Sequence, residues 1–210
     1  NPATIDYVEN VSKPFAKQHG IEFVEVQRVW HGEPLTLWEY ANKQNRNCPL
    51  PMRLATGAPG NRSCTIDFKI KVLDRWARQQ GYTHETVGLG ISTDEIQRAK
   101  TTEWNKENGI MKRKEYPLID MRLSRSDCHN IIRDAGLPDA PKSSCFFCPY
   151  HTTSTWLEMR EKQPELFAKA VALEKRLNEK REYLRLDRRY LHRYLRPLDE
   201  AIGAQTNMFD

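Results

Sequence analysis

The sequence predicts an α/β fold with a mainly parallel sheet and a helical C-terminal region. Short apolar runs that suit strands alternate with longer segments of helical periodicity, and this alternation is typical of βαβ units. The 210 residues are 39% hydrophobic and 10% aromatic, which is enough for the core of one full-sized domain. From residue 152 onward the pattern is largely helical.

The first half of the chain predicts three helices and two strands. Apolar residues recur at three- and four-residue spacing in the helical segments, and a glycine follows two of these segments, where a helix commonly ends. The segment 45–63 is rich in proline and glycine and is expected to be a loop. The expected helices span residues 4–19, 35–44 and 65–80, and the expected strands span residues 21–26 and 87–91.

Capping boxes mark two helix starts in the second half. Ser92 and Glu95 have this spacing directly after the strand 87–91. Thr155 and Glu158 have it at the start of the C-terminal helices. The other expected features are an extended segment at 116–119, a helix at 126–135 and a helix break near Pro164.

Positive charge is concentrated near the C-terminus. The whole chain carries +5, but residues 175–196 hold nine Lys or Arg against three acidic residues, which gives this segment +6. Such a segment suits a polyanionic partner, DNA or tRNA, and the alternative is a solvated helix face with internal ion pairs. Leu177, Leu184, Leu191 and Leu195 are expected to form one apolar stripe along this helix.

The chain is expected to be cytoplasmic and to have no membrane partner. No apolar run approaches the roughly 18 residues of a membrane span. The first residues lack the basic and apolar regions of a signal peptide, and without an initial Met they indicate a fragment or a processed product. The five cysteines are an odd number, unlike the even counts usual in secreted disulfide frameworks.

The sharpest chemical signal is the turn Cys145-x-x-Cys148, which His151 follows. Such a turn presents two thiolates to one metal ion or cluster, and His151 is placed to supply a third ligand. The alternatives are a thioredoxin-type redox pair and two inert thiols. The redox pair is disfavoured, because it needs a helix start directly after a strand and this loop continues with Pro149.

Further ligands must come from other parts of the chain. Cys64 precedes an expected helix whose N-terminal end favours a thiolate, so it is the leading candidate. Cys48 lies in a polar loop and is either a fourth ligand or without a role. Cys128 falls within the expected helix 126–135, where a small buried side chain is the favoured interpretation.

Several motifs occur in the order of a known family. They are Cys64-Thr65, Phe68-Lys69, Gly90-Ile91-Ser92, Asp94-Glu95 with Arg98, Tyr116-Pro117-Leu118-Ile119 and Ser144-Cys145-x-x-Cys148-Pro149. On these motifs the chain resembles the phosphoadenosine phosphosulfate (PAPS) reductase family of the adenine nucleotide α-hydrolase superfamily. That superfamily also contains sulfur-inserting DNA-modification proteins. The likeness covers the chain to about residue 160 and is nearest to a bacterial and phage-borne branch with a Cys-Phe-x-Cys-Pro box.

The resemblance implies a Rossmann-like sheet of the PP-loop ATPase (HUP-like) type and a site for ATP or adenylyl sulfate. In several family members cysteines hold a [4Fe-4S] cluster, which implies that Cys64, Cys145 and Cys148 ligate such a cluster or zinc here. Ser63 stands where cluster-bearing members have a further cysteine, so Cys48 and His151 are both candidates for the fourth ligand.

The resemblance also implies a nucleotide site that contains Arg62, Lys69, Ser92 and Arg98. The three cations would face phosphates or sulfate in one cleft at the C-terminal edge of the sheet. The alternative for each cation is a solvated side chain. The implied activity is nucleotide-dependent sulfur transfer or substrate adenylation by an enzyme of the ATP-pyrophosphatase or sulfotransferase type.

Two departures from the family pattern limit this expectation. The phosphate loop that follows the family's first strand is missing, so an α/β domain over 1–151 without that strand and loop is expected, followed by a helical region over 152–210. No cysteine follows Cys148, so reduction through a thiosulfonate intermediate is not expected. The alternative function is a nucleic-acid-associated module that a structural metal holds together, without catalysis.

Overall fold

The computed structural model describes residues 1–43 and 49–203. The chain forms two compact units, each made from two separate stretches of sequence. We call residues 1–26 and 73–143 the sheet unit, and residues 27–72 and 144–210 the helical unit. None of the boundaries between these units falls at residue 151. The expected division into regions 1–151 and 152–210 remains a prediction.

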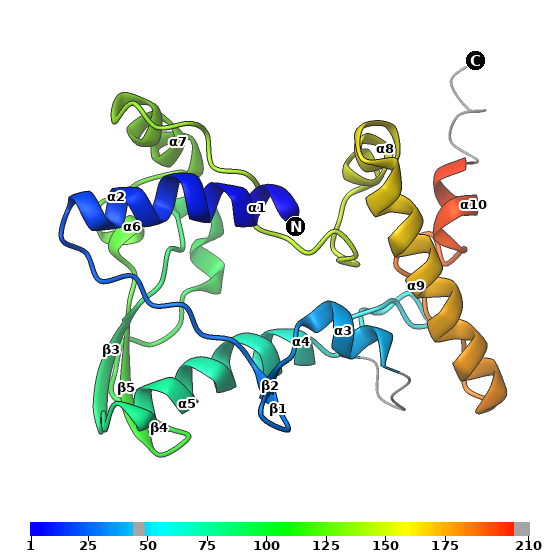
Figure 1. The fold of residues 1–210 in the computed structure, drawn as a ribbon, viewed down its shortest axis with the longest axis horizontal. Helices are drawn as coiled ribbons and strands as arrows, with labels where there is room; N and C mark the ends of the chain where they lie inside the picture. Colours follow the sequence, from blue (N-terminus) through cyan, green and yellow to red (C-terminus); the bar gives the residue numbers. More distant parts are fainter. Residues whose placement is uncertain (44–48, 204–210) are drawn as a thin grey trace. The chain divides into compact units, whose positions relative to one another are not determined.

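The sheet unit contains a small mixed sheet (Figure 1). Its strands are β3 (His84–Gly88), β4 (Asn105–Glu107) and β5 (Ile110–Glu115), in the spatial order β3-β5-β4. β3 pairs with β5 in parallel, and β4 pairs with β5 antiparallel. The α/β class is therefore confirmed, while the expected mainly parallel, Rossmann-like sheet remains a prediction.

A continuous helix opens the sheet unit, as expected for residues 4–19. It consists of α1 (Pro2–Tyr7), a π-helical turn η1 (Val8–Ser12) and α2 (Lys13–Gln18). Pro14 explains the π turn, because proline cannot donate to the carbonyl four residues earlier and its ring collides with that carbonyl. The extra residue in the turn relieves this conflict without ending the helix.

Short helices make up the rest of the sheet unit. The helix expected at 126–135 is confirmed, since Ser124 caps it by accepting a hydrogen bond from the backbone N–H of Asp127. The Ser92 capping box does not form, because the Ser92 hydroxyl donates to Asp94 instead. The helices are α5 (Lys71–Gln79, mostly in this unit), the 3-10 helix η3 (Thr93–Arg98), α6 (Pro117–Asp120) and α7 (Arg125–Asp134).

The helical unit is built around three helices that lie side by side (Figure 1). They are α8 (Thr153–Lys162), α9 (Pro164–Tyr183) and α10 (Leu198–Gly203), and the break before Pro164 is confirmed. α8 begins slightly earlier than expected, because Thr152 rather than Thr155 is its cap.

The 27–72 stretch completes the helical unit. Its helix α3 begins at a capping box between Thr36 and Glu39, which confirms the helix expected at 35–44 as far as the structure describes it. The elements of this stretch are β1 (Val29–Trp30), β2 (Glu33–Pro34), α3 (Leu37–Asn42), α4 (Ser63–Thr65) and the π-helical turn η2 (Ile66–Ile70). α4, η2 and α5 follow one another without a break, which confirms the helix expected at 65–80.

One continuous apolar core fills the helical unit. Trp156 of α8 is fully buried, and α9 and α10 contribute Leu173 and Ile202 to the same core. The other buried members are Ala41, Leu50, Met52, Phe147, Met159, Phe167, Ala170, Leu177, Leu191 and Leu198. Side chains from both stretches of the unit therefore share one interior, which fixes the position of the cysteine loop that lies beside it.

Four expectations about secondary structure are wrong. Residues 21–26 form no strand, and residues 117–120 are helical rather than extended. The expected strand 87–91 lies earlier, at β3, and β5 was not expected. The single leucine-striped helix over 175–196 does not exist, because α9 ends at Tyr183 and a loop follows it.

In the part of the chain that the structure describes, no helix is long and apolar enough to cross a membrane.

Candidate metal centre

The loop that carries Cys145 and Cys148 is held by two successive turns. The backbone N–H of Cys148 donates to the carbonyl of Cys145 at 3.0 Å, and that of His151 donates to the carbonyl of Cys148 at 3.1 Å. Phe147 is buried in the core, and its ring lies 5.3 Å from the ring of Trp38 on α3. The apolar residues between the cysteines thus anchor the loop, and both cysteines are half-buried beside the core.

Cys64 lies at the start of the helix that α4, η2 and α5 form. Its backbone N–H donates to the carbonyl of Pro49 at 2.9 Å, and the Ser63 hydroxyl donates to the same carbonyl at 3.1 Å. This double contact fixes the first turn of the helix. The thiol of Cys64 is half-buried and free of any disulfide.

Electrostatic interactions place Cys64 in the neighbourhood of the cysteine loop. Burial raises the pKa of the Cys145 thiol, and the charges of Cys148 and Cys64 raise that pKa further. The ammonium group of Lys69 acts in the opposite direction and lowers the Cys145 pKa. Interactions of this kind weaken with distance but act beyond direct contact, so they indicate only that the three cysteines and Lys69 lie in the same part of the helical unit. We call Cys64, Cys145 and Cys148 the thiol site.

A cation–π contact joins the same two segments. The guanidinium carbon of Arg62 lies 5.1 Å from the ring centre of Tyr150, which is two residues beyond Cys148. Such contacts favour the pairing by about 0.5–1 kcal/mol at exposed positions. Arg62 was expected to face a phosphate or sulfate, and Tyr150 was given no role. The contact between them joins distant segments and therefore leaves no local signal in the sequence.

The π-helical turn η2 explains how Lys69 comes to the side of Cys64. In a regular α-helix, residues five apart point about 140° away from each other. The π turn adds one residue, so the pair behaves as residues four apart do and lies on one side of the helix. π turns inside α-helices occur often at functional sites, and this one adjoins the thiol site.

His151 is buried behind the cysteine loop. Its Nε2 donates a hydrogen bond to the carbonyl of Cys145 at 2.9 Å, and its ring meets Trp156 edge-on at 4.9 Å. With the proton on Nε2, any metal ligation would use Nδ1, and a carbonyl partner is the usual support of a metal-binding histidine. Cys48, the other candidate for a fourth ligand, lies outside the described residues.

The donor chemistry of the thiol site fits a soft metal. Three cysteines are a suitable set for zinc or for an iron–sulfur cluster, which take thiolate ligands. Among residues 1–43 and 49–203, however, no group of three or more His, Cys, Asp or Glu side chains is gathered tightly enough to hold a metal ion. The three cysteines are therefore not arranged as metal ligands in the described structure, and metal binding remains a prediction.

The four expected nucleotide-site residues belong to different units. Arg62 and Lys69 lie in the helical unit with the thiol site, while Ser92 and Arg98 lie in the sheet unit. Arg98 is exposed and pairs with Glu95 at 2.6 Å, and Ser92 is buried. The single cleft expected for these residues remains a prediction.

Comparisons with protein-family models, with curated proteins and with solved structures give no match to this chain.

Proposed function

We propose that the chain belongs to a PAPS reductase-like enzyme that carries out nucleotide-dependent sulfur transfer or substrate adenylation. In this proposal Cys64, Cys145 and Cys148 hold a [4Fe-4S] cluster or zinc, with Cys48 or His151 as the fourth ligand. One observation supports it above the others: the guanidinium carbon of Arg62, two residues before Cys64, lies 5.1 Å from the ring centre of Tyr150, two residues after Cys148.

The surroundings of the thiol site suit anionic chemistry. Burial raises the pKa of the Cys145 thiol, and the ammonium group of Lys69 offsets part of that rise. Arg62 is exposed on the same helix start and is available to an anionic group such as the phosphate or sulfate of ATP or adenylyl sulfate. A bound cluster or zinc ion would keep the thiols ionised and would join the two segments.

The metal content of purified protein tests the first part of the proposal. Protein made with zinc, and protein reconstituted anaerobically with iron and sulfide, is analysed for bound metal and acid-labile sulfide. We expect stoichiometric binding of one of the two, with loss in Cys64→Ser and in Cys145→Ser. Cys128→Ser is the matched control, because Cys128 lies on α7 in the sheet unit. Failure of the wild type to bind either, or full binding by Cys64→Ser, contradicts the proposal.

Calorimetry with ATP and with adenylyl sulfate tests the nucleotide part. Lys69→Met is expected to weaken binding by roughly tenfold or more, since it removes one charged contact to a phosphate or sulfate. Lys169→Met, at an exposed position on α9, is the control and is expected to bind as the wild type does. Equal binding by Lys69→Met and Lys169→Met contradicts the role of Lys69.

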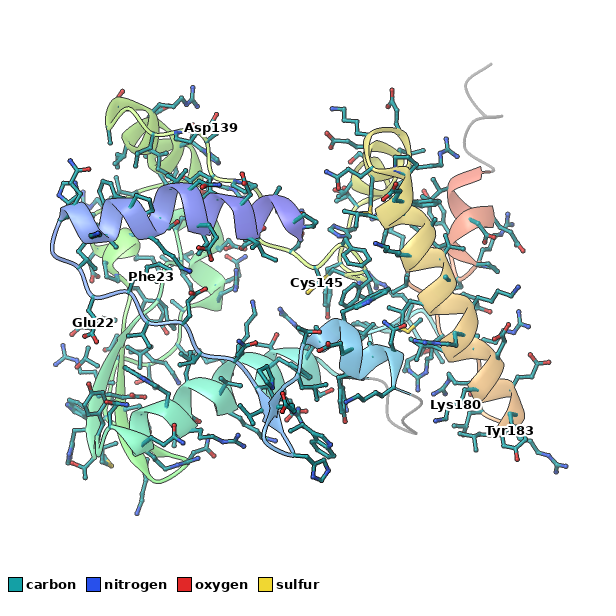
Figure 2. All side chains as sticks on the ribbon, viewed as in Figure 1. Glu22, Phe23, Asp139, Cys145, Lys180 and Tyr183 are labelled. Atoms are coloured by element: carbon teal, nitrogen blue, oxygen red, sulfur yellow. The ribbon has the colours of Figure 1, made fainter. Side chains whose placement is uncertain are left out.

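A second candidate function is a nucleic-acid-associated module, which DNA or tRNA would contact through residues 175–196. In the described part of this segment, Arg188 and Glu182 pair at 3.4 Å, and both side chains stay more than half exposed. Tyr183 at the end of α9 is 86% exposed and lies close to Lys180 in the chain (Figure 2). Exposed aromatic rings among basic residues are typical of single-strand binding surfaces.

A salt series with labelled DNA and tRNA tests this second candidate. The variant Arg185→Ala/Arg188→Ala/Arg193→Ala is expected to bind more weakly and with a shallower dependence on salt. The logarithmic slope should fall by about 0.7–0.9 for each phosphate that the variant no longer neutralises. Equal binding by the variant and the wild type, or no binding by either, leaves the segment as an ordinary solvated surface.

A further inference from the structure

A cavity of about 510 Å³ lies within the helical unit, beside the end of α9. Arg181 of α9 and Arg189 of the following loop line it, together with residues of the 49–63 loop and Tyr40 of α3. We call it the arginine cavity. Its volume falls within the roughly 300–1,000 Å³ that is usual for small-molecule sites. Both arginines belong to the basic segment 175–196, but they do not share one helix, because α9 ends at Tyr183.

The charge of the arginine cavity is positive. Its one acidic lining residue, among the described residues, is Asp67, whose carboxylate pairs with Lys71 at 2.7 Å. No described carboxylate forms an ion pair with the guanidinium of Arg189. Two guanidinium groups that line one cavity are an arrangement suited to a phosphate, since guanidinium groups form strong charge-assisted hydrogen bonds with phosphate oxygens.

The backbone around both arginines is held in place. The side chain of Asn178 accepts a hydrogen bond from the backbone N–H of Arg189 at 2.8 Å and donates to the Arg189 carbonyl at 2.7 Å. Nε of Arg181 donates to the carbonyl of Asp187 at 2.5 Å. Because these contacts exist without a ligand, little ordering entropy would be lost when an anion binds.

Part of the remaining wall is apolar, and it adjoins the polar side chains of Asn61 and Ser63. The half-buried ring of Tyr40 belongs to this part, together with the buried Leu50 and Met52. Tyr40 is itself held in place, since the ring of Phe68 lies 5.5 Å away and the guanidinium of Arg28 lies 5.0 Å from its centre. A rigid aromatic ring suits a planar heterocycle.

We propose that the arginine cavity binds a nucleoside phosphate, with the phosphate between Arg181 and Arg189 and the base against Tyr40. The ligand is either a free nucleotide or the terminal nucleotide of a nucleic-acid strand. The site needs no metal, and Cys64, Cys145, Cys148 and Lys69 are not part of its lining. The proposal therefore does not depend on the proposed function.

Calorimetry on the full chain tests the proposal with AMP, adenosine and a 5′-phosphorylated trinucleotide as probes. We expect AMP to bind the wild type, and adenosine, which lacks the phosphate, to bind at least roughly tenfold more weakly. Arg189→Ala is expected to weaken AMP binding by about tenfold to a hundredfold, and Arg189→Lys by less. Arg75→Ala, at an exposed position of α5, is the matched control.

The outcomes separate the two ligand sources and the two proposals. Tighter binding of AMP than of the trinucleotide identifies a free nucleotide, and the reverse identifies a strand end. The Cys64→Ser variant is expected to bind AMP as the wild type does, whatever its metal content. Absence of AMP binding, equal affinity for AMP and adenosine, or unchanged binding by Arg189→Ala while its thermal unfolding matches that of the wild type overturns the proposal.

Discussion

The sheet unit and the helical unit differ in what fills their interiors. The helical unit has one continuous apolar core, with Trp156 and Leu173 fully buried at its centre. In the sheet unit, few apolar side chains are buried, and a charged cluster lies among them. There Lys112 is 7% exposed and bonds to Asp74, which also accepts from Asn108, and it pairs with Glu85 at 2.5 Å.

Large apolar side chains are exposed on both units, so the difference between the units lies in their interiors. Many large apolar side chains of the sheet unit are exposed, and they include Ile5, Ile21, Phe23, Val24, Leu73, Ile96, Trp104, Met121 and Ile131. Figure 2 shows Phe23 beside Glu22 in the segment that follows α2. Apolar burial is the main stabilising term in folding, so the helical unit is expected to be the more stable of the two.

The largest effect is expected when the apolar core of the helical unit is opened. Trp156→Ala removes a fully buried ring and should lower the free energy of unfolding by about 3–5 kcal/mol. Urea unfolding measures this change. Tyr183→Ala, at a position that is 86% exposed, is the control and should change stability by less than about 0.5 kcal/mol. Similar losses in the two variants would show that the core is not continuous.

A slightly smaller loss is expected from the charged cluster of the sheet unit. Lys112→Met leaves the carboxylates of Asp74 and Glu85 together without their cation, at an expected cost of about 3 kcal/mol. Hydrogen exchange should show faster exchange in β3 and β5 but not in α9. Lys114→Met is the matched control, because its pair with Glu107 is partly exposed. If α9 also loses protection, the two units do not unfold separately.

The third prediction concerns Glu174, the one acid among the described residues of the helical unit whose pKa is strongly shifted. Its pKa is raised to about 7: burial is the largest cause, hydrogen bonds from the backbone N–H groups of Leu191 and Leu198 oppose the rise, and the nearby Asp199 and Glu200 add to it. The unfolded chain has the ordinary value of 4.5. Between these values the folded state keeps a proton that the unfolded chain has released, so stability falls as the pH rises from 4.5 to about 7.

Urea unfolding at about pH 5 and about pH 8 tests this dependence. The wild type should lose roughly 2–3 kcal/mol more than Glu174→Gln over this interval. His192 acts in the opposite direction, because burial lowers its pKa and it favours the folded state at higher pH. Its contribution is common to both proteins and cancels in the comparison. An equal pH dependence in the two proteins would show that Glu174 titrates normally.

The smallest expected effect is at Gly60, in the wall of the arginine cavity. A Cβ at this position would lie 2.8 Å from the carbonyl oxygen of Met52, so the backbone must shift in Gly60→Ala. We expect a loss of about 1–2 kcal/mol, read from the urea midpoint, together with weaker AMP binding. Gly90→Ala is the control, since nothing lies within 4 Å of a Cβ there. Unchanged stability and AMP binding in Gly60→Ala would show that the backbone around Gly60 and Met52 shifts at little cost in free energy.

Local signals predicted the helices well and the strands poorly. The periodic apolar residues of α2 and α5 and the glycines after them are local, and both helices formed. Ile21 and Phe23 alternate with polar residues as in a strand, yet they are 56% and 43% exposed, because no neighbouring strand pairs with them. β5 was missed because Lys112 lies in it, and a lysine is buried only when carboxylates from other segments meet it.

A local turn signal between β4 and β5 is missing from the elements expected from the sequence. Asn108 and Gly109 join β4 to β5, and both have positive φ, as a two-residue hairpin turn requires. For the thiol site, the Cys-x-x-Cys turn was evident from spacing, and the expected closeness of the Cys64 sulfur to the other two remains a prediction. The contact of Arg62 with Tyr150 and the cavity at Arg189 depend on non-local packing, which no residue pattern encodes.

The π-helical turn η2 sets the angular phase between Cys64 and the rest of its helix. Each residue of an α-helix advances the direction of its side chain by about 100°. A deletion of one residue between Cys64 and Lys69 that restored a regular helix would leave the two residues four apart, about 40° from each other in direction. Among homologues, a one-residue gap at this place should therefore be compatible with a retained cysteine.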